Sequence, residues 1–152
     1  MRKFMIVVDD TPECMNALRF AARRASKTGG GVVMLYVIAP EEFQHWVGVG
    51  EVMRAEAREA AEERLATLST EVETLAGVLP EFVIREGVAR DEILAQIKDD
   101  PEIGVLVLGA GDSNDGPGPL VSALAGRMSG TMSVPVTIVS GNLTNDQIDA
   151  VC

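Results

Sequence analysis

The sequence predicts an α/β protein with one five-stranded, parallel, open sheet and helices on both faces, a Rossmann-like arrangement. Short runs rich in β-branched residues alternate with longer segments in which apolar residues recur every three or four positions. Four of the five short runs are almost continuously apolar, which is typical of strands buried on both faces of a sheet. Because strand and helix alternate along the chain, parallel pairing through helical crossovers is expected.

The first predicted strand covers residues 3–9 and leads into a helix over 12–28. We interpret Thr11 as the N-cap of this helix and Pro12 as its first residue. Cys14 lies on the apolar stripe of the helix and is expected to be an inert core residue.

The second predicted strand covers 31–38, and a long amphipathic helix follows over 51–76. Its apolar residues are spaced alternately four and three apart, with Glu, Arg and Thr on the other face. Between them lies the least regular segment, residues 40–50, at the edge of the sheet where α/β proteins bind ligands. Phe43 and Trp46 in this segment either cover a flat ligand ring or pack the loop.

The second half of the chain repeats the alternation. It predicts strands over 81–86, 104–109 and 134–139, with a short helix over 90–99 and another over 119–130. The last strand contains Pro135, which favours a position at the edge of the sheet. No repeat or second domain is evident, so residues 1–140 form one domain.

The tail over 141–152 carries Thr144 three residues before Gln147. This is the spacing of a capping box, and it predicts a last short helix.

Composition excludes some classes of function. The net charge of −10 argues against nucleic-acid binding and against adsorption to anionic membranes. Two distant cysteines make neither a disulfide framework nor a metal cluster. With no signal-peptide pattern at the start and no long apolar stretch, we expect a cytoplasmic protein.

Asp9 and Asp10 follow the first strand. Asp9 either holds a ribose hydroxyl or a metal ion, or it complements the positive N-terminus of the next helix; for Asp10 we favour the second interpretation. A magnesium-binding receiver domain is excluded, because the third strand ends at Glu86 without its aspartate and the fifth at Ser140 without its lysine.

Residues 109–118 form a glycine-rich loop after the fourth strand, but the loop lacks the spacings of the known phosphate-binding fingerprints. His45 is the one histidine, so Ser-His and Cys-His couples depend on it, and a surface role is the expected one. The protein is therefore predicted not to be an enzyme. Arg19, Arg23 and Arg24 form either a solvated helix face or a docking surface for an acidic partner.

Taken together, these segments resemble the universal stress protein family over residues 3 to about 140. "FMIVVDDTPECMNALRFAARRA" is similar to the family's opening strand and helix, and "VVMLYVIAPEE" to its second strand. "VLVLGAGDSNDGPGPLVSALAGRMSGTMSVPVTIV" resembles its glycine loop, helix and Val-Pro-Val strand. The resemblance implies the fold of the adenine nucleotide alpha hydrolase-like proteins and a role in stress-linked regulation.

The resemblance also implies a nucleotide pocket. In this pocket Asp9 contacts adenosine, Thr11 lies beside it, and the backbone of Val37 contacts adenine. ATP-binding members carry G-x2-G-x9-G-[S/T] in the loop. This sequence has Gly109, Asp112, Ser122 and Ala123 at those positions, so one glycine remains.

Asp112 brings a side chain and a negative charge toward a triphosphate, and Ala123 lacks a hydroxyl donor. Gly111, Gly116 and Gly118 remain nearby, and Ser122 supplies a hydroxyl. We therefore expect a degenerate pocket that accepts either a less charged ligand such as AMP or a phosphate in an altered pose; the cofactor implied is AMP, or ATP with Mg²⁺.

Members of the family commonly dimerise through the last strand, and the resemblance implies a homodimer through 134–139. The leading hypothesis is a dimeric regulatory protein acting on a protein partner that the sequence does not identify. A second is an AMP or ATP sensor that uses Asp9 and the loop from Gly109 to Ser122. A third is a weak nucleotide hydrolase, which would need magnesium at Asp9 or Asp112.

Overall fold

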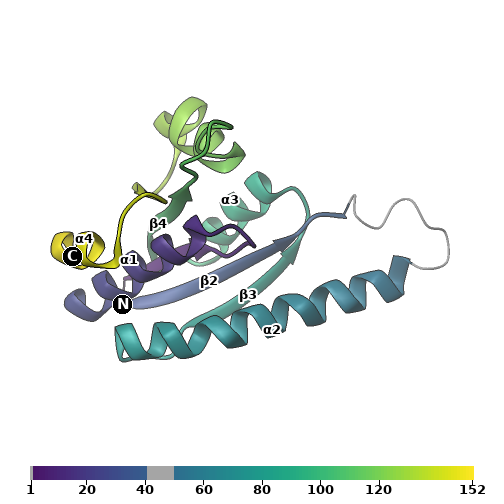
Figure 1. Ribbon diagram of the computed structural model, residues 1–152. Coiled ribbons are helices and arrows are strands. Elements are labelled where there is room, and N and C mark those ends of the chain that lie inside the picture. The colour runs from purple at the N-terminus through teal and green to yellow at the C-terminus, as the bar shows by residue number, and fades with distance from the viewer. Residues whose placement is uncertain (1, 41–49) are drawn as a thin grey trace.

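The computed structural model describes residues 2–40 and 50–152 (Figure 1). Phe43, His45 and Trp46 lie outside the described residues, so the interpretations of these three side chains stay predictions. Within the described ranges, none of the helices combines the length and the apolar character that crossing a membrane requires.

A five-stranded parallel sheet in the order β3-β2-β1-β4-β5 forms the centre of the protein. The strands are β1 (Lys3–Val7), β2 (Gly31–Ile38), β3 (Glu81–Glu86), β4 (Ile103–Ala110) and β5 (Val136–Ser140). This confirms the predicted fold class. The chain order reverses between β1 and β4, so the carboxyl ends of these two strands flank the point at which open α/β sheets bind ligands.

Helices cover both faces of the sheet (Figure 1). They are α1 (Glu13–Thr28), α2 (Gly50–Ala76), α3 (Ala89–Asp99), the π-helical segment η2 (Val121–Arg127), the 3₁₀ turn η3 (Ser129–Thr131) and α4 (Asn145–Val151). The apolar faces of α1, α2 and α4 pack on one side, through residues such as Leu18, Leu65 and Ile148. Ile93 of α3 and Leu124 of η2 pack on the other side.

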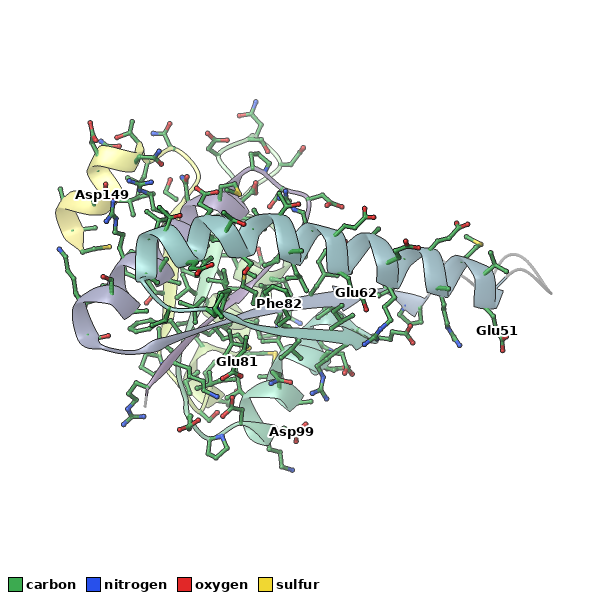
Figure 2. The ribbon with its side chains drawn as sticks, turned by 90° about the horizontal axis from the view of Figure 1, so that it is seen from below. Glu51, Glu62, Glu81, Phe82, Asp99 and Asp149 are labelled. Atoms are coloured by element: carbon green, nitrogen blue, oxygen red, sulfur yellow. The ribbon has the colours of Figure 1, made fainter. Side chains whose placement is uncertain are left out.

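The two edge strands differ from the central ones, because each leaves one side of its backbone unpaired within the described chain. Ile138 on β5 is 39% exposed, and Phe82 on β3 is 47% exposed (Figure 2). The placement of the last strand at an edge is thus confirmed. Figure 2 also shows α2 running past the strands, with Glu51 at its projecting end.

The segment predicted as a regular helix over 119–130 is not regular. The amide of Met128 donates to the carbonyl of Ala123, five residues earlier, at 2.9 Å, and this bond closes the π-helix η2. The 3₁₀ turn η3 follows. Apolar spacing alone does not distinguish this wider turn from an α-helix, because both bring Leu124 to the buried face.

The C-terminal tail forms α4, as predicted. Thr144 and Gln147 make both bonds of the capping box: the Thr144 hydroxyl accepts from the Gln147 amide, and the Gln147 side chain accepts from the Thr144 amide.

The arginines of α1 are only partly exposed and bond to the C-terminal tail, which corrects the interpretation as a fully solvated face; docking of an acidic partner stays a prediction. Arg19 donates to both carboxylate oxygens of Asp149, at 2.8 and 2.7 Å, and Arg23 adds a third bond at 3.2 Å. Arg24 donates to the carbonyl of Cys152. The Arg19 guanidinium lowers the pKa of Asp149, so the tether between α1 and α4 is complete above the ordinary aspartate pKa and weakens as the pH falls below it.

Candidate functional site

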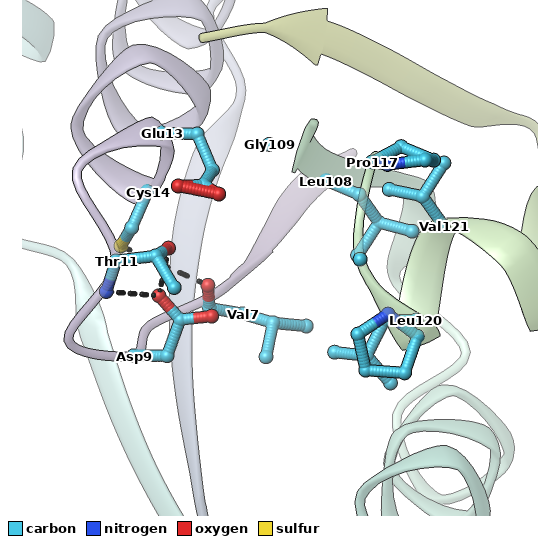
Figure 3. A pocket seen from close by; sticks show the side chains of 12 residues that line it. Val7, Asp9, Thr11, Glu13, Cys14, Leu108, Gly109, Pro117, Leu120 and Val121 are labelled. Carbon is cyan, nitrogen blue, oxygen red and sulfur yellow. Dashed lines mark hydrogen bonds between the residues drawn. The ribbon is translucent and has the colours of Figure 1, made fainter. Parts of the chain in front are cut away.

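Three adjoining hollows lie at the carboxyl edge of the sheet. The first, the acidic hollow, has a volume of about 220 Å³ and lies between the ends of β1 and β4, the first turn of α1 and residues 117–121. Its lining includes the carboxylates of Asp9 and Glu13 (Figure 3), and among the described residues it contains no lysine, arginine or histidine. The charged side chains known to line this hollow are therefore both acidic.

Asp9 is held in place by its neighbour Thr11. Oδ1 of Asp9 accepts bonds from both the backbone amide and the hydroxyl of Thr11. Its other oxygen, Oδ2, makes no hydrogen bond with any residue that the structure describes. One carboxylate oxygen thus fixes the orientation while the other remains available to a ligand.

This geometry corrects the predicted start of α1. The helix begins at Glu13, Pro12 stands at its cap position, and no side chain caps it. The Thr11 hydroxyl donates to Asp9 instead of accepting an amide of the helix. Asp9 forms an Asx-type turn with the residue two positions on, and this local bond competes with the cap.

Glu13 is the residue that sequence reasoning missed. A Cβ at Gly111 would lie 3.0 Å from Oε2 of Glu13, so this carboxylate stands against the glycine loop. Gly109 allows the approach, because a Cβ there would lie 2.4 Å from the backbone oxygen of Glu13. In Figure 3, Asp9 and Glu13 lie on the α1 side of the hollow, opposite Pro117, Leu120 and Val121.

Several backbone amides of the glycine loop donate hydrogen bonds within the loop and its flanking residues. The amide of Gly111 donates to the carbonyl of Pro117, that of Gly116 to Ser113, and that of Ser122 to Gly118. The amide of Asp115 donates to the hydroxyl of Ser113. A phosphate cradle requires free amides that converge on the anion. Four amides of this segment are already bonded internally, and the Glu13 carboxylate lies beside Gly111.

Asp112 and Asp115 are exposed and line none of the three hollows. The expectation that Asp112 opposes a phosphate on this loop therefore stays a prediction. Glu13, which comes from the other end of the chain, brings the negative charge to the loop.

The second, apolar hollow is larger, at about 460 Å³, which lies within the range of small-molecule pockets. It joins the acidic hollow at Asp9, Pro119 and Leu120, and its walls are mainly valine side chains from the ends of β1 and β2 and the start of α3: Val7, Val8, Val37 and Val88. It is wide and apolar enough for a flat heterocyclic ring.

The third hollow, of about 260 Å³, is lined by Arg90, Arg127 and Ser122 and joins the apolar hollow at Arg90, Pro119 and Ala123. We call it the arginine hollow. The three hollows share lining residues, and we call them together the groove: its acidic end carries two carboxylates, its middle is apolar and its third part carries two arginines.

The predicted site residues are distributed along this groove. Asp9, Thr11, Gly109 and Gly118 line its acidic end, Val37 and Ala123 its middle, and Ser122 its positive end. Gly111 and Gly116 line none of the hollows and belong to the closed loop. Arg90, like Glu13, was not predicted, because its place depends on how α3 packs beside η2.

Two further groups stand near Asp9. Arg64 of α2 donates to the backbone carbonyl of Asp9 at 3.4 Å, and its buried Nε has no partner among the described residues. Cys14 is buried, as predicted, and its burial raises the pKa of the thiol. Within residues 2–40 and 50–152, no three His, Cys, Asp or Glu side chains gather as metal ligands.

The groove and fold can be compared with known proteins. The chain is similar to the solved structure of the universal stress protein UspA from Lactobacillus plantarum, with a TM-score of 0.73 and 21% identity over 91% of this chain and 97% of that one. It is also similar to a universal stress protein from Arabidopsis thaliana with AMP bound, with a TM-score of 0.63 and 16% identity over 92% of each chain.

A third similar structure is a universal stress protein in complex with cAMP, with a TM-score of 0.64 and 14% identity over 91% of this chain and 96% of that one. At such identities the likeness shows a shared fold. A comparison with curated proteins finds no match. The model of the universal stress protein family matches residues 1–140, and the chain therefore belongs to the universal stress protein family.

Proposed function

We propose that this protein is a regulatory member of its family that binds an adenine mononucleotide in the groove. The observation that carries the proposal is the place of the groove: it opens at the carboxyl ends of β1 and β4, where the strand order reverses. Two structural relatives, one with AMP bound and one in complex with cAMP, support the choice of ligand.

In this proposal the ribose lies beside Asp9 and the adenine lies in the apolar hollow next to Val37. The free oxygen of Asp9 can accept hydrogen bonds from ribose hydroxyls, and the valine walls provide contact area for a purine. In this proposal a triphosphate is disfavoured on the glycine loop, because the amides of Gly111, Gly116 and Ser122 are bonded internally and the Glu13 carboxylate lies beside Gly111. AMP is therefore the expected ligand, in preference to ATP with Mg²⁺.

We propose that the protein acts by binding and not by catalysis. Among the described residues, no group of three His, Cys, Asp or Glu side chains is gathered to hold the metal ion that a nucleotide hydrolase would use. A cytoplasmic location and a regulatory protein partner remain part of the proposal, and the two unpaired cysteines, Cys14 and Cys152, are in keeping with a reducing compartment.

The proposal is tested by calorimetric titration of the nucleotide-stripped protein. We expect AMP to bind with a micromolar Kd. ATP with Mg²⁺ should bind at least about tenfold more weakly, which is a difference of about 1.4 kcal/mol in binding free energy. GMP is the control for recognition of the base. Binding should also raise Tm as the AMP concentration increases. The proposal fails if AMP gives neither heat nor a shift of Tm at millimolar concentration.

We further propose that two copies pair through β5. Its outer backbone edge is unpaired in the described chain and carries the half-exposed Ile138. In sedimentation experiments at micromolar concentration we expect a dimer, which Ile138→Lys converts to a monomer. Phe82→Lys on the opposite edge is the matched control and should leave the dimer intact. If Phe82→Lys gave a monomer and Ile138→Lys left the dimer intact, the interface would lie on β3 instead.

A further inference from the structure

We propose that the phosphate of a bound mononucleotide lies between Arg90 and Arg127, at the end of the groove opposite Glu13, and not on the glycine loop. This inference rests on the proposed function, because it assigns the direction in which that ligand lies.

The acidic end of the groove repels a phosphate. Asp9 and Glu13 both line it, and no positive side chain is among its lining residues. At about 4 Å, two like charges near a protein surface repel by a few kcal/mol before screening. On the nearby loop the amides of Gly111, Gly116 and Ser122 already have acceptors, which leaves fewer donors for a phosphate.

The opposite end attracts a phosphate. Arg90 and Arg127 line one hollow together with the hydroxyl-bearing Ser122, and none of the described residues that line it is acidic. Arg127 makes no ion pair with any residue in the described ranges. Arg90 pairs with its neighbour Asp91 through Nε at 3.2 Å, and both side chains are at least half exposed. Such a pair is weak, and the remaining guanidinium nitrogens of Arg90 can serve as donors.

The middle of the groove sets the orientation of the bound nucleotide. Asp9 and Arg90 both line the apolar hollow. A nucleoside in this hollow therefore places its ribose between a carboxylate that accepts from hydroxyls and a guanidinium that donates to phosphate. One ligand can satisfy both groups only if its phosphate points toward the arginine hollow.

The test compares adenosine with AMP in titrations of the full-length protein and its variants. Arg90→Ala and Arg127→Ala should each weaken the binding of AMP about five- to tenfold. This is the effect expected for the loss of one partly exposed, charge-assisted hydrogen bond. They should leave the affinity for adenosine within about twofold. Arg58→Ala is the matched control, because Arg58 is similarly exposed and also pairs with a near neighbour, Glu62, but lies on α2.

Glu13→Gln separates the two possible directions of the ligand. It should change AMP affinity less than about twofold, whereas a phosphate over the glycine loop would gain about tenfold or more from loss of the charge. The inference is overturned if AMP binds the arginine variants and the unmodified protein equally. If neither adenosine nor AMP binds the unmodified protein, the proposed function itself fails.

Discussion

Gly109→Ala should lower the stability of the protein by about 2–4 kcal/mol, which for a chain of this size corresponds to a fall in Tm of roughly 5 to 12 °C. The new Cβ would lie 2.4 Å from the carbonyl oxygen and 2.7 Å from the carbonyl carbon of Glu13. These are backbone atoms of the first turn of α1, so no side chain can rotate away. The turn itself would have to move off the end of β4.

Gly126→Ala is the matched control for this measurement. Nothing lies within 4 Å of the position that its Cβ would take, and it lies within the helical segment η2. Alanine is favoured over glycine in helices by up to about 1 kcal/mol, so Tm should stay constant or rise. Thermal melts followed by circular dichroism compare the two variants. If both melted at the same temperature, the close contact between α1 and β4 would be refuted.

Asp9→Ala should weaken the binding of both adenosine and AMP by about tenfold or more. The substitution removes a charged acceptor for ribose hydroxyls, and such a bond contributes about 1.5–3 kcal/mol. The affinities for adenosine and for AMP should fall by the same factor, because the contact is with the ribose. Titration calorimetry with both ligands measures this effect separately from that of the arginines.

Asp10→Ala and Asp9→Asn are the controls for the Asp9→Ala variant. Asp10 is adjacent and equal in charge, but it is exposed and lines none of the three hollows, so its removal should leave the affinity unchanged. The amide oxygen of Asp9→Asn can still accept the two bonds from Thr11, so the local turn is retained while the charge is lost. Equal AMP affinity in Asp9→Ala and Asp10→Ala would exclude Asp9 from the binding site.

Much of the fold was predictable because its signals are local. The nearly continuous apolar runs predict the central strands, which are buried on both faces, and Thr144 with Gln147 predicts the cap of α4 from a spacing of three residues. Asp9 and Val37 could be placed at the site because both lie at the carboxyl ends of strands, and parallel strands bring those ends to one edge.

The remaining features depend on contacts between distant segments. Glu13 looks like an ordinary first-turn acid of a helix, and its place beside Gly111 depends on how closely α1 approaches β4. Arg19 appears free in the sequence because its partner, Asp149, lies in the tail. The start of α1 was mispredicted for a different reason: two local hydrogen-bond patterns compete for Thr11, and the sequence does not show which of them forms.

Helix α1 touches the functional parts of the molecule on successive turns. Its first turn supplies Glu13 and Cys14 to the groove. The side-chain amide of Asn16 then donates to the carbonyls of Ser140 and Leu143 at the end of β5, and Arg19 holds α4 through Asp149. The one helix therefore ties the groove to the end of the outer strand and to the tail, so a substitution that displaces its first turn is expected to disturb all three.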